Sequence, residues 1–165
     1  MAKTKIQKQE SLKKISEILK GAKSVVFAGF DKLTVGENTQ ARKTMRTSGV
    51  KLLTVKKTLL AKALAESQYG AGPDLKGQVA LAYAQEDSDA LAPAREVFQA
   101  GRKYDGKFSI LGGIFDGAYA DSERMLSIAM IPSREVLLAQ FVNLINSPIQ
   151  RFAVVLDAIA KTKSA

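Results

Sequence analysis

Two adjacent lysines stand where a predicted strand meets a predicted helix. Residues 50–55 carry β-favouring apolar residues at near-alternate positions, and residues 58–66 carry apolar residues at helical spacing. Lys56 and Lys57 lie at the junction, and Thr58 is a residue type that often caps a helix. A helix start carries unpaired N–H groups and a partial positive charge, so this site suits a phosphate. A solvated turn is the alternative interpretation.

A second basic group is predicted on the helix before that strand. Thr34 and Glu37 have the spacing of a capping box and begin a helix over residues 34–48. The helix carries Arg42, Lys43 and Arg46. Because like charges four residues apart repel by a few tenths of a kcal/mol, Arg42 and Arg46 favour an anionic partner over the alternative of a solvated face.

The positive charge of the chain is concentrated in its first two-fifths. Residues 1–65 hold 15 Lys and Arg against 4 Asp and Glu, whereas residues 66–165 hold 10 against 12. Such asymmetry indicates a polyanion partner for one part of the molecule, and nucleic acid is the usual one. An anionic membrane surface is the weaker alternative, because no predicted helix combines a strongly basic face with an aromatic-rich apolar face.

The residue types needed for most enzyme chemistry are absent from the sequence. There is no His and no Cys, which removes the commonest general base, the thiol nucleophile and most zinc and haem sites. The sequence also lacks a Walker-type phosphate loop and a nucleophile elbow. We therefore expect a protein that is not an enzyme and that needs no cofactor and no metal.

The 165 residues suffice for one α/β domain and an appendage. No apolar run approaches the roughly 20 residues that a membrane span needs. The basic N-terminus is not followed by the apolar core of a signal peptide. These features, with the lack of Cys, fit a cytoplasmic protein.

Strands and helices alternate through the first 130 residues. Apolar runs and periodicities predict strands at 24–30, 50–55, 78–84 and 108–115, and helices at 3–20, 34–48, 58–66, 88–103 and 121–130. A Gly- and Pro-containing loop is predicted at 69–73, and Gly112-Gly113 is interpreted as a bulge or close backbone approach. This order predicts an α/β domain over residues 1–130 whose four-stranded sheet is covered by helices.

The character of the chain changes from Ile131, and residues 131–165 are predicted to form a helical extension. Pro132 breaks the chain, a helix follows to about Ile145, and Ser147-Pro148 has the pattern of a second helix start. The last predicted helix, 149–163, places apolar residues on one stripe: Ile149, Phe152, Val155, Leu156 and Ile159. Either both helices cover the sheet, or the last offers its apolar face to a partner helix.

Five blocks of the sequence resemble a known family. They are Ser24-Val25-Val26 with Leu33-Thr34-Val35; Arg42-Lys43 with Arg46 and Gly49-Val50; Val55-Lys56 with Thr58-Leu59-Leu60 and Ala63-Leu64; Leu75 with Gly77; and Ile131-Pro132-Ser133-Arg134-Glu135 with Leu137-Leu138. In collinear order they resemble large-subunit ribosomal protein number ten, the bacterial stalk-base family. The chain departs from that family at Asp31-Lys32, where Arg-Gly is usual, and at Lys57, where Asn is usual.

The resemblance implies a scaffold of the cytoplasmic ribosome. The family's basic N-terminal domain binds large-subunit rRNA beside ribosomal protein number eleven. Its C-terminal helix carries dimers of the acidic stalk protein, the seven/twelve protein, which recruit translational GTPases and stimulate their GTP hydrolysis.

Mapped onto this sequence, the resemblance supplies two sets of candidate site residues. The RNA-binding candidates are Lys32, Arg42, Lys43, Arg46, Lys56 and Lys57. The stalk-dimer candidates are the stripe on the last helix, with part of the preceding helix. At 1.5 Å per residue that last helix would be roughly 22 Å long, which favours one or two dimers. A DNA-binding regulatory protein is the alternative function, although no helix-turn-helix pattern with a base-reading helix is found.

Overall fold

The computed structural model describes residues 5–66, 77–84 and 89–163, although the side chains of residues 5–7 are not among the features described. The chain divides into two compact units, Met1–Ile131 and Pro132–Ala165. The predicted loop at 69–73 and the predicted first residues of two helices, Lys3 and Ser88, lie outside the described residues.

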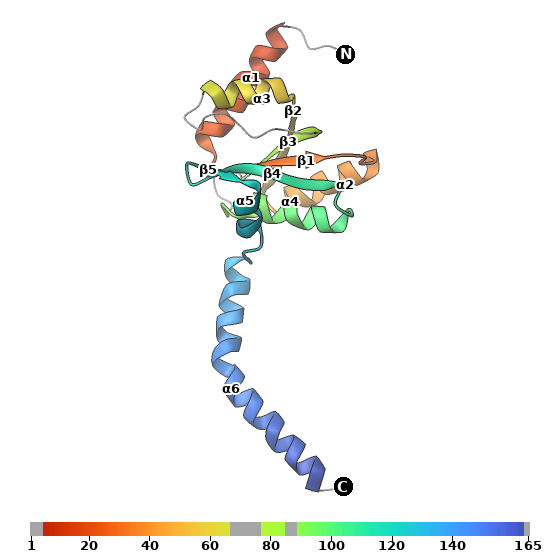
Figure 1. Ribbon diagram of the computed structural model, residues 1–165, viewed down its shortest axis with the longest axis vertical. Coiled ribbons are helices and arrows are strands. Elements are labelled where there is room, and N and C mark those ends of the chain that lie inside the picture. The colour runs from red at the N-terminus through yellow and green to blue at the C-terminus, as the bar shows by residue number, and fades with distance from the viewer. Residues whose placement is uncertain (1–4, 67–76, 85–88, 164–165) are drawn as a thin grey trace. The chain divides into compact units, whose positions relative to one another are not determined.

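The first unit is built on an antiparallel sheet of five strands (Figure 1). The strands are β1 Ser24–Phe30, β2 Val50–Val55, β3 Gln78–Ala84, β4 Phe108–Phe115 and β5 Ala118–Asp121, in the order β2-β3-β1-β4-β5. The first four match the predicted strands, so the α/β class is confirmed. The predicted count of four is one short, because β5 has only four residues, too few to show a hydrophobic period, and joins β4 through the tight turn at Asp116 and Gly117.

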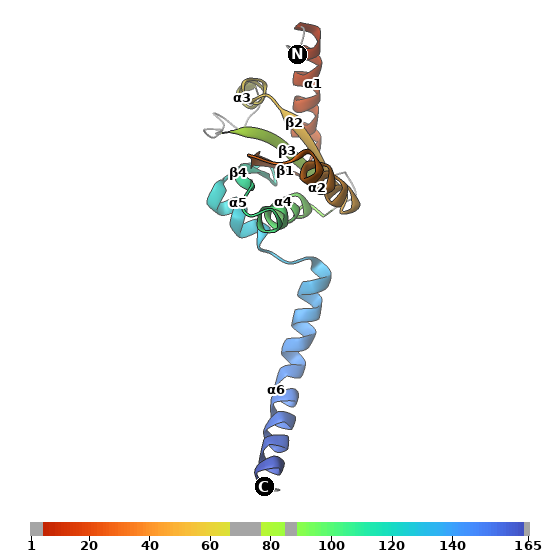
Figure 2. The same cartoon turned by 90° about the vertical axis from the view of Figure 1, so that its right-hand side faces the viewer.

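Helices cover both faces of this sheet (Figures 1 and 2). They are α1 Lys5–Gly21, α2 Val35–Thr47, α3 Lys57–Glu66, α4 Ala92–Lys103 and α5 Ser122–Ala129. One apolar core lies between the sheet and α1 with α3, and the other lies between the sheet and α2, α4 and α5. The central strand β1 is buried on both faces, because Val25 and Phe27 enter the first core while Val26 and Ala28 enter the second. Its continuous apolar sequence is explained by this position.

The starts of helices α3 and α4 differ from the predicted ones in ways that concern the candidate site and its surroundings. Helix α3 begins at Lys57, so Lys56 is its cap rather than Thr58, and the carbonyl of Lys56 accepts the N–H groups of Leu59 and Leu60 at 3.0 and 3.1 Å. The reason is that β2 ends at Val55 and the chain turns into the helix within one residue.

Helix α4 begins at Ala92, later than the predicted 88. Asp89 lies just before the turn at residues 90–91 that leads into the helix. Its carboxylate accepts the Leu91 N–H at 3.1 Å and an Arg95 N–H at 2.7 Å. Partial burial raises the pKa of Asp89, but these hydrogen bonds and the Arg95 charge outweigh it and lower that pKa below its usual value. Asp89 therefore lies outside the helix and not in its first turn, and its charged carboxylate binds the Leu91 N–H and the Arg95 side chain.

The predicted irregularity at Gly112-Gly113 is confirmed. The register of β1 with β4 shifts between Phe27 and Ala28, so that β4 bulges before Gly112, whose φ is 139°. A Cβ on Gly113 would collide with the Val25 carbonyl at 2.5 Å and with the Met125 side chain. The bulge and the close approach both require glycine here.

The second unit is a single helix, α6, Arg134–Lys163, which Figure 1 shows bending near its middle. The prediction of two helices separated at Ser147-Pro148 is wrong, since Pro148 lies inside this helix. Proline removes one backbone hydrogen bond and kinks a helix. The helical segments before and after Pro148 are long enough for the helix to continue across it. With 30 residues, α6 is about 45 Å long, about twice the length expected for the last helix.

Candidate RNA interface and docking helix

The sheet register brings three of the predicted basic residues to one end of the sheet. Phe30 at the end of β1 pairs with Gln78, and Val55 at the end of β2 pairs with Val79. Both strands therefore end together, separated by β3, which places their ends about 10 Å apart. Lys32 follows the first strand, Lys56 and Lys57 follow the second, and all three are exposed. Lys32 and Lys56, which are 24 positions apart in the chain, are thus neighbours at this end of the sheet.

The loop that carries Lys32 has a left-handed turn. Lys32 has a φ of 53°, a region that favours glycine, and its N–H donates to the Asp31 carboxylate at 3.0 Å. The side chain of Asp31 thereby holds a conformation that costs a lysine backbone strain.

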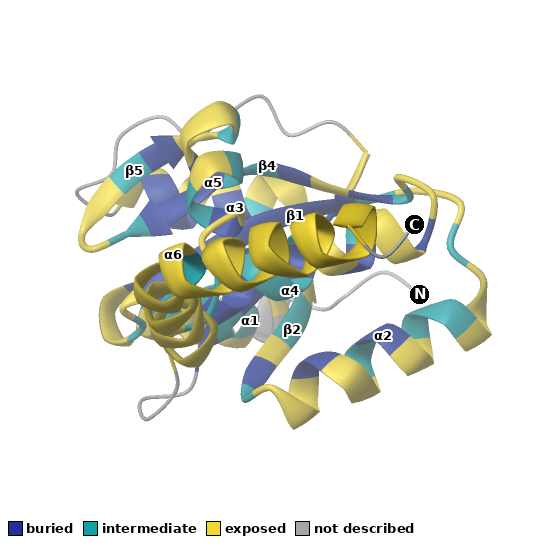
Figure 3. Cartoon of the chain, turned by 90° about the horizontal axis from the view of Figure 1, so that it is seen from below, coloured by how far each residue is buried: buried dark blue, intermediate teal, exposed yellow. Residues whose placement is uncertain are grey.

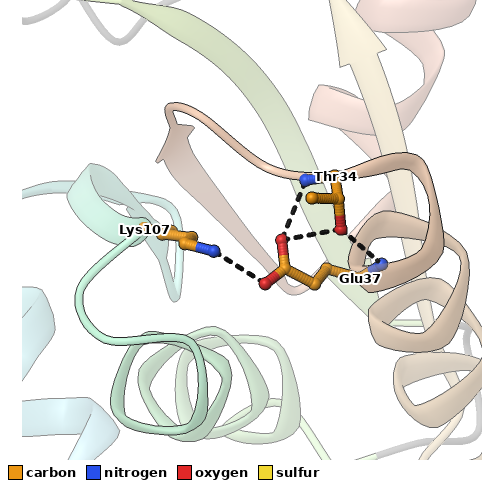
Figure 4. Close-up of polar contacts among 3 residues, drawn as sticks. All are labelled: Thr34, Glu37 and Lys107. Carbon is orange, nitrogen blue, oxygen red and sulfur yellow. Dashed lines mark hydrogen bonds and ion pairs between the residues drawn. The ribbon is translucent and has the colours of Figure 1, made fainter.

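This loop is fastened to the rest of the sheet by three residues, shown in Figure 4. The Thr34 N–H and hydroxyl donate to one Glu37 carboxylate oxygen at 2.8 and 2.9 Å, and the Glu37 N–H donates to the Thr34 hydroxyl at 3.3 Å, which completes the predicted capping box. The Lys107 ammonium donates to the other carboxylate oxygen at 2.7 Å. Lys107 first, and then Thr34, lower the pKa of Glu37 to about 2. The start of α2 is thus tied to the start of β4.

Arg42 is held within the protein by three hydrogen bonds. Its guanidinium donates to Asn38 at 2.9 Å, to the Leu52 carbonyl at 2.7 Å and to the Thr54 hydroxyl at 2.7 Å. Since β2 is an edge strand, Arg42 covers part of its open edge and fastens α2 to it. Three of the five guanidinium N–H donors are used in this way, so Arg42 is a positioning residue that keeps two donors for a ligand.

Basic side chains continue along this edge of the sheet. Lys43 and Arg46 are exposed on α2. A hollow of about 300 Å³ lies beside β2 and is lined by Arg42, Arg46, Lys51, Leu52, Leu53 and Tyr83. Sequence reasoning missed Lys51 and Tyr83, because only the pairing of β2 with β3 places them opposite one another. The alternation of exposed and apolar residues along this strand, Lys51 followed by Leu52, could have predicted from the sequence that Lys51 faces outward.

Helix α6 is coloured as exposed along nearly its whole length in Figure 3, and its large apolar residues are among the exposed ones. No residue of α6 is buried, and Phe141, Leu144, Ile149 and Phe152 are each at least 60% exposed. Apolar residues recur at alternating spacings of three and four, namely Leu138, Phe141, Ile145, Pro148, Phe152, Val155 and Ile159. This is the spacing of a seam that packs against another helix. The predicted stripe at the end of α6 therefore continues through Pro148 into its first half.

The described part of the chain carries no metal site and no single membrane-spanning helix. In the part of the chain that the structure describes, no group of three His, Cys, Asp or Glu residues could hold a metal ion. Among the same residues, none of the helices taken alone has an apolar stretch that would span a bilayer. Only α5 and α6 taken together, across the break between them, satisfy the length and composition criteria.

Comparison with known proteins identifies the family. The profile of the family "Ribosomal protein L10" matches residues 3–100, and that of "Ribosomal protein uL10 C-terminal region" matches residues 131–165. The chain belongs to the uL10 family of ribosomal proteins. It is similar to "Large ribosomal subunit protein uL10" of Lacticaseibacillus casei (strain BL23), with 35% identity over 95% of this chain and 92% of the relative.

Two further uL10 relatives span nearly the whole chain. The protein of Delftia acidovorans is 35% identical over 99% of this chain and 92% of its own, and that of Shouchella clausii is 31% identical over 99% and 97%. The resemblance seen in the sequence blocks is thereby confirmed. As a uL10 protein, the chain is a structural constituent of the large ribosomal subunit, bound to the ribosome in the cytoplasm, and not an enzyme.

Proposed function

We propose that this uL10 protein is the scaffold at the base of the ribosomal stalk. The α/β domain predicted over residues 1–130 binds large-subunit rRNA beside ribosomal protein number eleven. Its helical extension, residues 131–165, anchors dimers of the acidic seven/twelve stalk protein, and these recruit translational GTPases.

The RNA-binding half of this proposal is supported by basic side chains that gather at one end of the sheet and along its β2 edge. Lys32, Lys56 and Lys57 share the end at which β1 and β2 finish, and Arg46 lies on the helix that Arg42 fastens to β2. Exposed lysines and arginines neutralise phosphates and release counterions, which supplies the sequence-independent part of RNA affinity. The Lys56–Lys57 pair also stands at the start of α3, where the helix dipole favours an anion.

The observation that carries the docking half is that α6 buries none of its residues although its apolar side chains form one seam. Both apolar cores of the first unit are made of residues up to Ala129, so the fold does not draw on α6 for its interior. An apolar surface of this extent is usually covered by a partner. The alternating spacing of three and four selects a helical partner, which fits a helix of each stalk dimer.

The length of α6 changes the expectation for the number of dimers. The expectation of one or two dimers rested on a last helix of about 22 Å. A continuous seam from Leu138 to Ile159 gives a longer surface, and length alone then sets no such limit.

Copurification of the tagged protein from its own cells at moderate salt tests the proposal. We expect large-subunit rRNA and acidic stalk protein to copurify. Recovery of duplex DNA in place of rRNA would indicate the DNA-binding alternative. Recovery of rRNA without stalk protein would contradict the docking half alone.

A further inference from the structure

The hollow beside β2 combines charges with an aromatic ring and apolar side chains. Lys51 on β2 lies directly opposite Tyr83 on β3, so both side chains project on the same face of the sheet. Leu53, two residues after Lys51, projects on that face as well. Arg46 reaches the hollow from α2. A hollow that served only a phosphate would not need the ring or the leucines.

The walls of this hollow are well fixed. Arg42 is held by its bonds to Leu52 and Thr54, and Tyr83 packs against the core beneath α1 and α3. The volume of about 300 Å³ is at the lower end of the range for small-ligand pockets. None of its six described lining residues is acidic, so the charge they contribute is entirely positive.

We propose that this hollow holds one unpaired nucleotide of the bound RNA, with its base stacked on Tyr83 and its phosphate paired with Arg46 and Lys51. Proteins read single-stranded RNA by stacking its unpaired bases on aromatic side chains, while arginine and lysine hold the backbone. The inference rests on the RNA-binding function proposed above and adds a specific contact to it. The lysines at the ends of β1 and β2 supply attraction to any polyanion, whereas the hollow selects an exposed base.

A tryptophan reporter tests the stack directly, because the protein contains no Trp. The Tyr83→Trp variant keeps a stacking ring, and saturation with large-subunit rRNA purified from the same organism is expected to quench its fluorescence. The matched control is Tyr119→Trp on β5, at the opposite edge of the sheet, whose fluorescence is expected to stay constant. Equal quenching in both variants, or none in Tyr83→Trp at saturation, would overturn the stack.

Affinity measurements separate the ring from the charge. Tyr83→Leu is expected to weaken binding roughly 5- to 150-fold with an unchanged salt slope, and Tyr83→Phe to bind like the parent. Lys51→Gln is expected to reduce the slope of log K against log salt by about 0.7–0.9, unlike Lys103→Gln on α4. Wild-type affinity and slope in Tyr83→Leu and Lys51→Gln would refute the pocket. Failure of the parent protein to bind the rRNA would instead refute the proposed function.

Discussion

Lys107 and Glu37 are 70 residues apart in the chain, yet the Lys107 ammonium lies 2.7 Å from the Glu37 carboxylate. The pair joins the first turn of α2 to the start of β4, across the loop that carries Lys32. The Asp31 N–H donates to the Lys107 carbonyl at 3.1 Å, which makes a second link at the same place. The geometry of the proposed RNA-binding surface at this end of the sheet therefore depends on a contact outside that surface.

The ion pair predicts a dependence of stability on pH. The pKa of Glu37 is about 2 in the folded protein and near 4.5 in the unfolded chain. A lowered folded pKa gives stability that is present above pH 4.5 and lost as the pH falls from 4.5 towards 2. Urea unfolding of the parent and of Glu37→Gln should show a difference in free energy of unfolding at pH 7 that shrinks by pH 3. A difference that is equal at both pH values would contradict this role of Glu37.

Replacement of Lys56 and Lys57 by Ser should weaken RNA binding and flatten its salt dependence. Each phosphate contact contributes roughly 0.7–0.9 to the slope of log K against log salt. The matched control is the double change of the exposed Lys13 and Lys14 on α1 to Ser, which removes the same charge elsewhere. The phosphate site at the start of α3 is wrong if the control flattens the slope equally or if the Lys56 and Lys57 variant binds like the parent.

Arg42 and Arg46 should behave differently although they lie one turn apart on α2. Arg42→Met removes hydrogen bonds to Asn38, Leu52 and Thr54 and should lower the free energy of unfolding by about 1–3 kcal/mol. Arg46→Met should change it by less than about 0.5 kcal/mol, because Arg46 is exposed, while reducing RNA affinity. Equal stability of the two variants in urea unfolding would show that the Arg42 contacts are not maintained in solution.

The fragment 1–131 is expected to fold by itself. Its sheet and both of its cores are complete without α6, since their last buried residue is Ala129. A cooperative thermal melt and a far-UV circular dichroism spectrum with both helix and strand signals would support this. An aggregated or unfolded fragment would mean that the interior needs the helical extension.

Local patterns in the sequence predicted most of the fold. Strands β1, β3 and β4 follow from mainly apolar runs and β2 from near-alternate apolar residues, and the α2 start follows from the Thr34–Glu37 capping box. The fifth strand was missed because four residues with one buried side chain give too weak a pattern. The predicted division of α6 was wrong because a Ser-Pro pair is typical of a helix start as a local pattern. Here helical residues precede and follow the pair, so Pro148 lies inside one continuous helix.

The candidate site was less predictable because it depends on pairing between distant strands. Lys32 and Lys56 become neighbours only because β1 and β2 both pair with β3. Tyr83 lies opposite Lys51 only because of the register between β2 and β3. Arg42 was predicted from its charge, but its three internal bonds depend on how α2 lies against β2. The residue types therefore predicted that a basic surface exists, whereas the pairing of the strands determines which residues form it.

The apolar seam of α6 is the surface proposed to dock the stalk-protein dimers. Each buried Phe or Leu contributes roughly 1.5–3 kcal/mol, so loss of two should weaken a docked partner by orders of magnitude. The matched control is Gln150→Asp with Ala153→Asp, which adds the same charge away from the seam.

The most direct test uses the Phe152→Asp, Leu156→Asp variant, which changes one seam residue and, beside the seam, Leu156 of the predicted stripe. Stalk-protein dimers are counted on this seam variant, bound to large-subunit rRNA, by native mass spectrometry of the reconstituted complex. We expect dimers on the parent and the control, none or few on the seam variant, and the same rRNA affinity and salt slope for all three. A seam variant that keeps its full set of dimers, or that loses rRNA binding and its cooperative melt, would contradict the docking role of α6.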